Sequence, residues 1–194
     1  MRIMLVIPLL LASTAVAAGG GPLRASTDVI VFGHELVLFG QFTNRLPDQT
    51  VIVRAKEPGD PGYTTVSVAT TGSRGRWRVR VTPTIETTYE ARTVSEASAP
   101  LVIHVRPHVS LKRRQGRFVV RVVSTASYEG RFVLIQRRAS GRWRAIGRVI
   151  VSAKPRRFNV ALPRGSSTLR AYLPRSQAGR GYVAGVSPPI VVRR

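Results

Sequence analysis

The stretch GRWRVRVTPTIETTYEA, residues 75–91, shows most clearly how this chain folds. Charged and apolar side chains alternate across residues 76–81, which is the pattern of a β-strand with one buried and one exposed face. Pro83 ends this strand, because proline cannot donate a hydrogen bond to a sheet. The β-prone run TTYEA then begins a second strand. The stretch therefore predicts two short strands joined by a turn, with Trp77 and Tyr89 in the core.

Runs of this kind recur about every ten residues, and turns rich in Gly, Pro and Asp separate them, as in antiparallel sandwiches. No segment after residue 28 keeps a helical period for three turns. The sequence therefore predicts an all-β chain of two tandem antiparallel β-sandwich domains. We expect strands at residues 28–32, 35–42, 49–56, 63–70, 76–82, 87–94, 100–105, 108–112, 117–124, 131–138, 142–151, 156–162, 168–173 and 189–194.

The two halves of the chain are related by a shift of about 80 residues, which places Ala91 on Ala171. The tetrapeptide GRWR occurs twice, at residues 75–78 and 141–144, but superposing the two copies destroys the strand pattern. In the better register Trp77 matches Phe158, and Trp143 matches Tyr63. The two copies are therefore expected at different strands, and the core is expected to contain Trp77, Tyr89, Trp143 and Phe158.

The N-terminus has the pattern of a secretory signal peptide over residues 1–17, with an early arginine, a short apolar run and small residues before the cleavage site. A flexible segment is expected at residues 18–27, followed by domains at 28–106 and 107–194. No later stretch is long enough for a transmembrane helix. The chain has no cysteine, which excludes disulfides and a lipid-modified N-terminal Cys. We expect a secreted, extracellular protein that is either released or associated with the cell wall.

Positive charge is concentrated in the second half of the chain. Residues 18–106 contain 10 Lys and Arg against 8 Asp and Glu, whereas residues 107–194 contain 20 against 1. The only acid of the second domain is Glu129, so most of its arginines have no carboxylate partner within that domain. Such a surface attracts polyanions. The predominance of Arg over Lys is also what a GC-rich genome produces, but codon bias does not explain the shortage of acids in one half.

The first domain resembles the bacterial immunoglobulin-like repeats of secreted and surface proteins from GC-rich Gram-positive bacteria. The stretches VFGHELVLFGQF, QTVIVRAK, GRWRVRVTPTIETTYEA and SAPLVIHV carry the resemblance. The positions typical of that family are matched by Gly33, Gly40, Trp77 and residues 87–91. The second domain is a looser match, with Leu169 in place of the family's Tyr. The resemblance implies Ig-like or fibronectin III-like sandwiches, and this architecture hosts many functions.

No enzyme motif accompanies this fold. The three histidines, His34, His104 and His108, lie in a turn and beside the interdomain Pro107, and neither G-x-S-x-G nor H-E-x-x-H occurs. His104 and His108 lack a third metal ligand, and the two acids of the EPGDPG loop are too few for calcium. We therefore expect no enzymatic activity, no metal and no cofactor.

The arginines are the remaining candidates for function. We expect an anion-binding surface on the second domain, although a merely solvated charged face fits the same pattern. A secreted protein of the cell envelope that binds an anionic wall polymer or polysaccharide is the first hypothesis, with no specific nucleic-acid target. The alternative is an adhesin or accessory module that recognises a protein or glycan through its loops, EPGDPG or RSQAGRGYVAG. The expected anion-binding residues are Arg137, Arg138, Arg142, Arg144, Arg148, Arg156 and Arg157.

Overall fold

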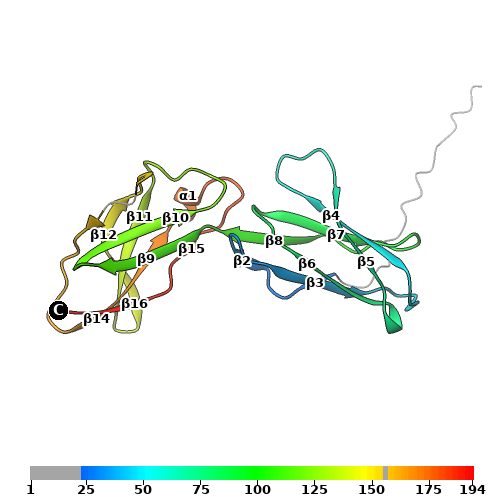
Figure 1. Cartoon of the computed structure of the whole chain (residues 1–194), viewed down its shortest axis with the longest axis horizontal. Coiled ribbons are helices and arrows are strands. Elements are labelled where there is room, and N and C mark those ends of the chain that lie inside the picture. Colours follow the sequence, from blue (N-terminus) through cyan, green and yellow to red (C-terminus); the bar gives the residue numbers. More distant parts are fainter. Residues whose placement is uncertain (1–22, 155–156) are drawn as a thin grey trace, which may run out of the picture.

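The computed structural model describes residues 23–154 and 157–194. The expected signal peptide, residues 18–22 of the expected flexible segment, and Arg156 lie outside the described residues. The described chain is almost entirely β-structure and forms two sandwiches placed end to end (Figure 1). The predicted all-β fold of two tandem Ig-like sandwiches is therefore confirmed.

The first sandwich contains two sheets, in the orders β1-β3-β6 and β2-β8-β7-β4-β5. The strands pair antiparallel, except that β2 runs parallel to β8. The elements are β1 (Arg24–Ala25), β2 (Val29–Val31), β3 (Leu36–Gln41), β4 (Thr50–Lys56), β5 (Thr64–Thr70), the 3₁₀ turn η1 (Ser73–Gly75), β6 (Arg76–Val81), β7 (Thr87–Arg92) and β8 (Leu101–Arg106).

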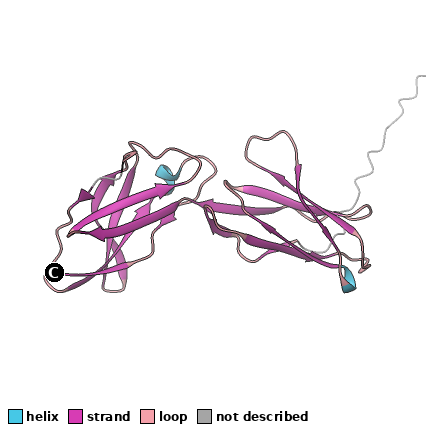
Figure 2. Ribbon diagram, viewed as in Figure 1, coloured by secondary structure: helices cyan, strands magenta, loops and turns pink. Residues whose placement is uncertain are grey.

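The second sandwich also contains two sheets, in the orders β13-β10-β9 and β12-β11-β14-β15, with β16 paired to β14. Only one short helix is found among its described residues (Figure 2). The elements are β9 (His108–Arg114), β10 (Arg117–Val123), β11 (Phe132–Ala139), β12 (Arg142–Ile150), β13 (Arg157–Phe158), β14 (Ser166–Leu173), α1 (Arg175–Ala178), β15 (Gly185–Val186) and β16 (Ile190–Arg193).

The start of the described chain differs from the sequence expectation. Residues 23–27 were expected to be flexible, but Leu23 is buried and β1 pairs antiparallel with β3. The Ser26 amide also donates to the Val37 carbonyl at 2.9 Å. Burial of a leucine and these backbone hydrogen bonds fix the segment to the sheet. The expectation of flexibility is therefore wrong for residues 23–27.

A buried serine marks equivalent positions in the two domains. The Ser98 hydroxyl accepts a hydrogen bond from the Ala91 amide at 2.9 Å, and the Ser187 hydroxyl accepts one from the Ala171 amide at 2.9 Å. Each serine amide in turn donates to the carbonyl of the same alanine, at 2.8 Å and 2.9 Å. Ala91 and Ala171 therefore occupy the same place in the two folds, in agreement with the shift of about 80 residues read from the sequence.

A β-bulge also occurs at equivalent positions, and it changes the position of one tryptophan. The pairing of β4 with β5 shifts register after Val53, and that of β11 with β12 shifts after Ile135. Without the bulge, Trp143 would share the inner face with Val149, because side chains of a strand alternate. The bulge adds one residue and reverses the alternation. Trp143 is therefore half-buried and outside the hydrophobic core, and its assignment as a core residue is wrong.

The other three expected core residues pack as follows. Trp77 and Tyr89 are buried in the first domain, and the Trp77 ring stacks on Phe42 with centroids 6.2 Å apart. Phe158 is partly buried and packs against the core of the second domain, with its ring centroid 5.9 Å from that of Phe118. The pair in the second domain joins β10 and β13, whereas in the first domain Phe42 directly follows β3 and Trp77 lies on β6.

The two domains make direct contact at the joint. Only Pro107 separates β8 from β9. The Tyr182 hydroxyl donates to the Thr84 carbonyl at 2.9 Å, and the Glu86 amide donates to the Gly181 carbonyl at 2.9 Å. A Cβ on Gly181 would lie 2.4 Å from Ile85 Cγ1, so a glycine is needed at this close approach. The loop after α1 therefore serves as an interdomain contact.

Candidate functional site

The expected arginines of the second domain do not share one face. Arg137 lies opposite Arg144, and Arg142 lies opposite Ala139 two residues further along the same face. Arg138 lies opposite Trp143 on the other face of the β11–β12 hairpin. The β-bulge separates the arginines onto two faces. It turns the Trp143 side chain to the outer face, so the flanking Arg142 and Arg144 lie on the inner face. The hairpin presents two arginine surfaces instead of one.

The first surface consists of Arg137, Arg142 and Arg144, which we call the hairpin arginine triad. Arg137 occupies the place that the buried Ala55 fills in the first domain, at the end of the inner face. Arg142 and Arg144 are exposed. Like charges directly opposite each other on neighbouring strands destabilise a sheet. The triad therefore concentrates positive charge at a place where an anion would relieve repulsion.

On the other face of the hairpin the arginines stack on aromatic rings. The Arg148 guanidinium lies 4.2 Å from the Phe132 ring centroid, and that of Arg170 lies 4.2 Å from the Trp143 ring centroid. The Arg170 Nε also donates to the Gln136 side-chain oxygen at 2.8 Å. Burial lowers the pKa of Arg170. These contacts explain why Trp143 and Arg148 are ordered on an outer face without any acid beside them.

Arg157 lies apart from the hairpin. It belongs to β13 in the other sheet, where its guanidinium donates to the Gln115 side-chain oxygen at 2.6 Å. Arg157 and Arg148 do line one shallow pocket of about 370 Å³ between the sheets. The described residues of the expected set thus fall into three places. The triad lies on one face of the β11–β12 hairpin, Arg138 and Arg148 lie on the other face, and Arg157 lies on β13.

Every ion pair among the described residues lies in the first domain. The pairs are Arg54–Glu90, Arg92–Glu90, Arg80–Glu35 and His104–Glu86. Within the described chain no arginine of the second domain therefore has a carboxylate within 4.0 Å. The charge of that domain is not neutralised by carboxylates among the described residues, although Arg157 and Arg170 donate to glutamine side chains. The exposed guanidinium groups of the triad are available to external anions.

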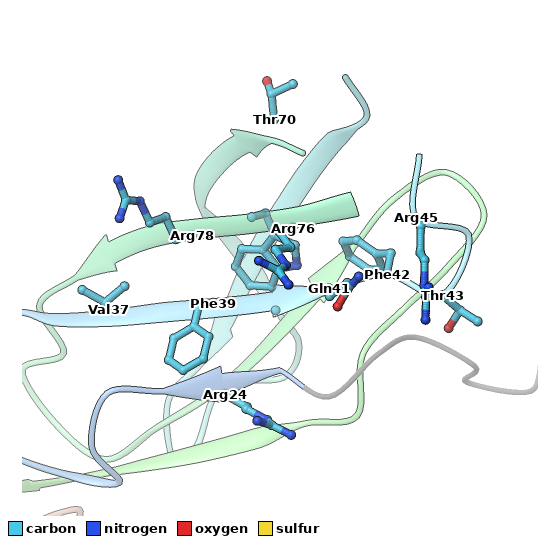
Figure 3. Close-up of a pocket in the computed structure, with 12 residues that line it drawn as sticks. Arg24, Val37, Phe39, Gln41, Phe42, Thr43, Arg45, Thr70, Arg76 and Arg78 are labelled. Atoms are coloured by element: carbon cyan, nitrogen blue, oxygen red, sulfur yellow. The ribbon is translucent and has the colours of Figure 1, made fainter. Parts of the chain in front are cut away.

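The first domain contains a groove that the sequence did not predict. It has a volume of about 1040 Å³ and lies along the outer face and end of the β1-β3-β6 sheet (Figure 3). We call it the β1-β3-β6 groove. Its lining includes four exposed arginines, an exposed phenyl ring and a glutamine, namely Arg24, Arg45, Arg76, Arg78, Phe39 and Gln41. Gly40, Phe42 and Trp77 also contribute to its wall.

Strand register explains how the groove brings these side chains together. Arg24 pairs with Phe39, and Phe39 pairs with Arg78, so the three form a row across β1, β3 and β6. Gln41 pairs with Arg76 in the next row on the same face. Side chains of paired residues on one face are close neighbours. The row places a flat apolar ring between two guanidinium groups.

Arg45 reaches the groove from a turn whose backbone is held on two sides. The Glu96 carboxylate accepts hydrogen bonds from the Thr43 and Asn44 amides, both at 2.9 Å. Partial burial would raise the pKa of Glu96, but these hydrogen bonds outweigh it and hold the pKa below its usual value. On the other side, a Cβ on Gly75 would lie 2.7 Å from Arg45 Cα. The groove is therefore shaped by its supporting contacts before any ligand arrives.

One strand pattern in the sequence partly indicates this groove. Alternation in β6 predicts that Arg76, Arg78 and Arg80 face outward while Trp77 and Val79 face inward, and the structure agrees. The participation of Arg24 was missed because β1 has only two residues and no detectable period. Arg45 was missed because its position depends on the fold of a turn.

The histidines and loop tyrosines have structural positions. His104 Nδ1 lies 2.6 Å from Glu86 Oε2 beside the interdomain contact. Tyr128 and Tyr182, which lie outside the strands of the second domain, are both buried. Within the described residues no group of three or more His, Asp or Glu side chains is placed to hold a metal ion. In the same part of the chain no helix has the length and apolar character needed to span a bilayer.

Comparison with known proteins finds similarity in fold. No protein-family model matches the chain, and no curated protein matches it. Among solved structures, the human OSCAR ligand-binding domain is 14% identical with a TM-score of 0.30, covering 89% of this chain and 97% of that one. A cytokine receptor complex is 12% identical with a TM-score of 0.42, covering 88% of this chain and 96% of that one. At this level of identity the likeness concerns the fold alone.

Proposed function

We propose that this protein is a secreted, non-enzymatic Ig-like protein of the bacterial cell envelope. Its second domain binds an anionic wall or matrix polymer through arginine contacts. One observation carries the proposal: among the described residues, all ion pairs lie in the first domain, while the second domain holds the arginine triad without a carboxylate partner. Guanidinium groups bind carboxylate and phosphate in a forked geometry, which suits polymers that repeat such groups.

Two glycines support the resemblance to bacterial Ig-like repeats. Gly33 has a positive φ of 84° in the turn before β3, a conformation that favours glycine. Gly40 lies opposite Trp77, and a Cβ there would lie 3.0 Å from the indole Nε1. Both positions are those at which the family carries glycine. The physical need for them supports membership of that family as part of the proposal.

The adhesin alternative requires loops that are free to bind a partner, but one of the two candidate loops is partly buried and contacts the other domain. The RSQAGRGYVAG loop contains Ala178 and Tyr182, which are buried, and it contacts the first domain at Gly181. The EPGDPG loop is closed by a hydrogen bond from the Glu57 amide to the Asp60 carboxylate at 3.0 Å. The EPGDPG loop is exposed, so under the adhesin alternative this loop of the first domain would bind the protein or glycan.

The test compares charge reversals of equal size at two places. The double variant Arg137→Glu with Arg144→Glu removes the centre of the triad, and Arg117→Glu with Arg121→Glu changes the net charge equally on exposed positions of β10. Binding of the full chain to polygalacturonate, a polymer of uronic acid, is measured by calorimetry. We expect the triad variant to bind at least roughly tenfold more weakly and the β10 variant to change affinity only about twofold.

Equal weakening by both variants would show that only net charge matters and would contradict a located binding surface. Because Arg137 is half-buried, thermal unfolding of each variant is measured first. The double variant Arg137→Gln with Arg144→Gln, which adds no acid, should show the same order of effects. Loss of binding on changing the EPGDPG loop, with the triad variants unaffected, would support the adhesin alternative instead.

A further inference from the structure

The β1-β3-β6 groove of the first domain has the composition of a ligand site. Four exposed arginines and an exposed phenylalanine, Phe39, which is 37% accessible, line it. Within the described chain, none of Arg24, Arg45, Arg76 and Arg78 forms an ion pair. The first domain contains 8 acids, so charge partners exist but are placed elsewhere. The groove arginines are therefore unpaired because the acids of this domain lie elsewhere, and not because the domain lacks acids.

Arg80 shows that this arrangement is local. It lies on the same strand and face as Arg78, two residues along, but its guanidinium lies 3.5 Å from the Glu35 carboxylate. Arg54 and Arg92 are likewise paired with Glu90. The arginines outside the groove on β4, β6 and β7 are thus neutralised, whereas those that line it are not. This contrast separates the groove from a uniformly charged surface.

The size and shape of the groove indicate a ligand larger than an ion. Its volume of about 1040 Å³ is at the upper end of the range of sites that hold drug-sized molecules, about 300–1,000 Å³. The row Arg24, Phe39, Arg78 offers a flat apolar surface between two forked donors. Gln41 adds an amide: its Nε2 donates to the Arg74 carbonyl at 2.8 Å, which leaves its side-chain oxygen as a hydrogen-bond acceptor.

We propose that the β1-β3-β6 groove binds a short acidic oligosaccharide, with a sugar ring on Phe39 and its carboxylates held by Arg24, Arg78 and Arg76. The apolar face of a sugar ring packs on a phenyl ring, and carboxylates accept forked hydrogen bonds from guanidinium groups. Sugar hydroxyls supply donors for the Gln41 oxygen. The site lies in the other domain from the arginine triad, so it goes beyond the function proposed above and does not depend on it.

The supporting contacts prepare the site. Arg45 is placed by the turn that Glu96 and Gly75 hold, and Trp77 fills the space beneath Gly40. Because these contacts exist without ligand, little ordering is needed on binding, which favours affinity for a short ligand. Arg45 then closes the end of the groove nearest the turn (Figure 3).

The experiment measures binding of tetragalacturonate by calorimetry to the full chain carrying Arg137→Gln and Arg144→Gln, so that the triad of the second domain does not contribute to the affinity. We expect Arg78→Gln alone to weaken binding roughly fivefold, and Arg24→Gln with Arg78→Gln to weaken it roughly tenfold or more, since each removes a charged hydrogen-bond donor. Arg80→Gln is the matched control on the same strand and face, and it should change affinity less than about twofold because its charge is already paired. Phe39→Ala should weaken binding about fivefold through loss of ring contact, with Val102→Ala as an exposed apolar control.

Two further ligands separate the sources of affinity. Maltotetraose has the rings without the charge, and a tetramer of glycerol phosphate has the charge without the rings; both should bind at least roughly tenfold more weakly than tetragalacturonate. Equal effects of Arg78→Gln and Arg80→Gln, or no effect of Phe39→Ala, would overturn the groove site. If the unchanged chain bound tetragalacturonate but the chain with Arg137→Gln and Arg144→Gln did not, the groove would be overturned while the function proposed above would stand.

Discussion

In β6 the segment GRWR places Trp77 in the core with 5% of its surface exposed, whereas in β12 the same four residues place Trp143 on an outer face beneath Arg170. The difference follows from one β-bulge, which reverses the alternation of β12 between Trp143 and Val149. The glycines also differ, because Gly75 packs against the backbone of Arg45 while Gly141 has open space around its Cα. Identical local sequences thus take different roles once the pairing around them differs.

The two domains also differ in one pair of facing residues, which lies on β4 and β7 in the first domain and on β11 and β14 in the second. In the first domain Arg54 pairs with Glu90 and stacks on Tyr63, with its guanidinium 5.3 Å from the ring centroid. At the equivalent positions the second domain has Gln136 and Arg170, and the arginine stacks on Trp143 instead. Arg170 thus stands where the first domain has Glu90, and Gln136 stands where it has Arg54. The second domain has thereby kept an arginine–aromatic contact while losing a carboxylate, which raises its net positive charge.

The largest expected contrast is between the two tryptophans. Trp77→Ala should lower the free energy of unfolding of the first domain by about 3–5 kcal/mol, because it leaves a cavity beside Phe42. Trp143→Ala should lower that of the second domain by only about 1 kcal/mol, since it removes a partly exposed ring and its contact with Arg170. Urea denaturation followed by circular dichroism measures both. Equal losses would contradict the reversal of alternation in β12.

The two glycines provide the next contrast. Both have a positive φ, 68° at Gly75 and 75° at Gly141, so each alanine pays about 1 kcal/mol for the left-handed conformation. Gly75→Ala also forces a Cβ to within 2.7 Å of Arg45 Cα, and this clash should raise the total loss to about 2–4 kcal/mol. Thermal unfolding of the two variants tests the difference. Gly75→Ala should also weaken ligand binding in the groove, which Gly141→Ala should leave unchanged.

Alkaline pH should destabilise the first domain through Tyr89, and burial also raises the pKa of Tyr128 in the second domain. Burial raises the pKa of the Tyr89 hydroxyl to about 12, although a hydrogen bond from Thr87 opposes the shift, and the second domain has Leu169 in its place. A hydroxyl whose pKa is higher in the folded state stabilises it fully below about pH 10, and this stability is lost as the pH rises toward 12. At pH 11 the loss is on the order of 1 kcal/mol. The variant Tyr89→Phe should remove that part of the alkaline destabilisation, and unchanged pH dependence would contradict it.

Acid pH should have the smallest effect, again on the first domain. The amide hydrogen bonds that hold the pKa of Glu96 below its usual value stabilise the 43–45 turn above about pH 4.3, and this contribution is lost as the pH falls through the lowered pKa. Glu96→Gln should therefore reduce the fall in Tm of the first domain between pH 6 and pH 2. Asp48→Asn, an exposed acid that is not in an ion pair within the described chain, is the control and should leave the fall unchanged.

The strands could be predicted from the sequence because alternation and turn residues act locally. All fourteen strands expected from the sequence correspond to strands of the structure, although β13 is much shorter than expected, at two residues. The strands β1 and β15 have two residues each and carry no period that a sequence could show. Their existence depends on neighbours that are distant along the chain, since β1 pairs with β3 and β15 with β14.

The sites were harder to predict because they depend on which strands lie side by side. The seven arginines expected to form one surface are separated by the bulge and by the assignment of Arg157 to the other sheet, and Arg156 lies outside the described residues. The groove joins Arg24, Phe39 and Arg78 from three strands, and no sequence spacing relates them. Charge composition located the basic domain, but register and the bulge determine which charges meet.

We propose that the arginines of the second domain, none of which forms an ion pair among the described residues, bind an anionic polymer. The most direct test is the affinity of the full chain for polygalacturonate as a function of salt concentration. Counterion release predicts a straight line in log affinity against log salt, with a slope of about −2 to −3 if three arginines of the triad contact the polymer. The slope should become shallower by roughly 1 to 2 in the Arg137→Gln with Arg144→Gln variant. An affinity that does not change with salt, or a slope that the variant leaves unaltered, would contradict the claim.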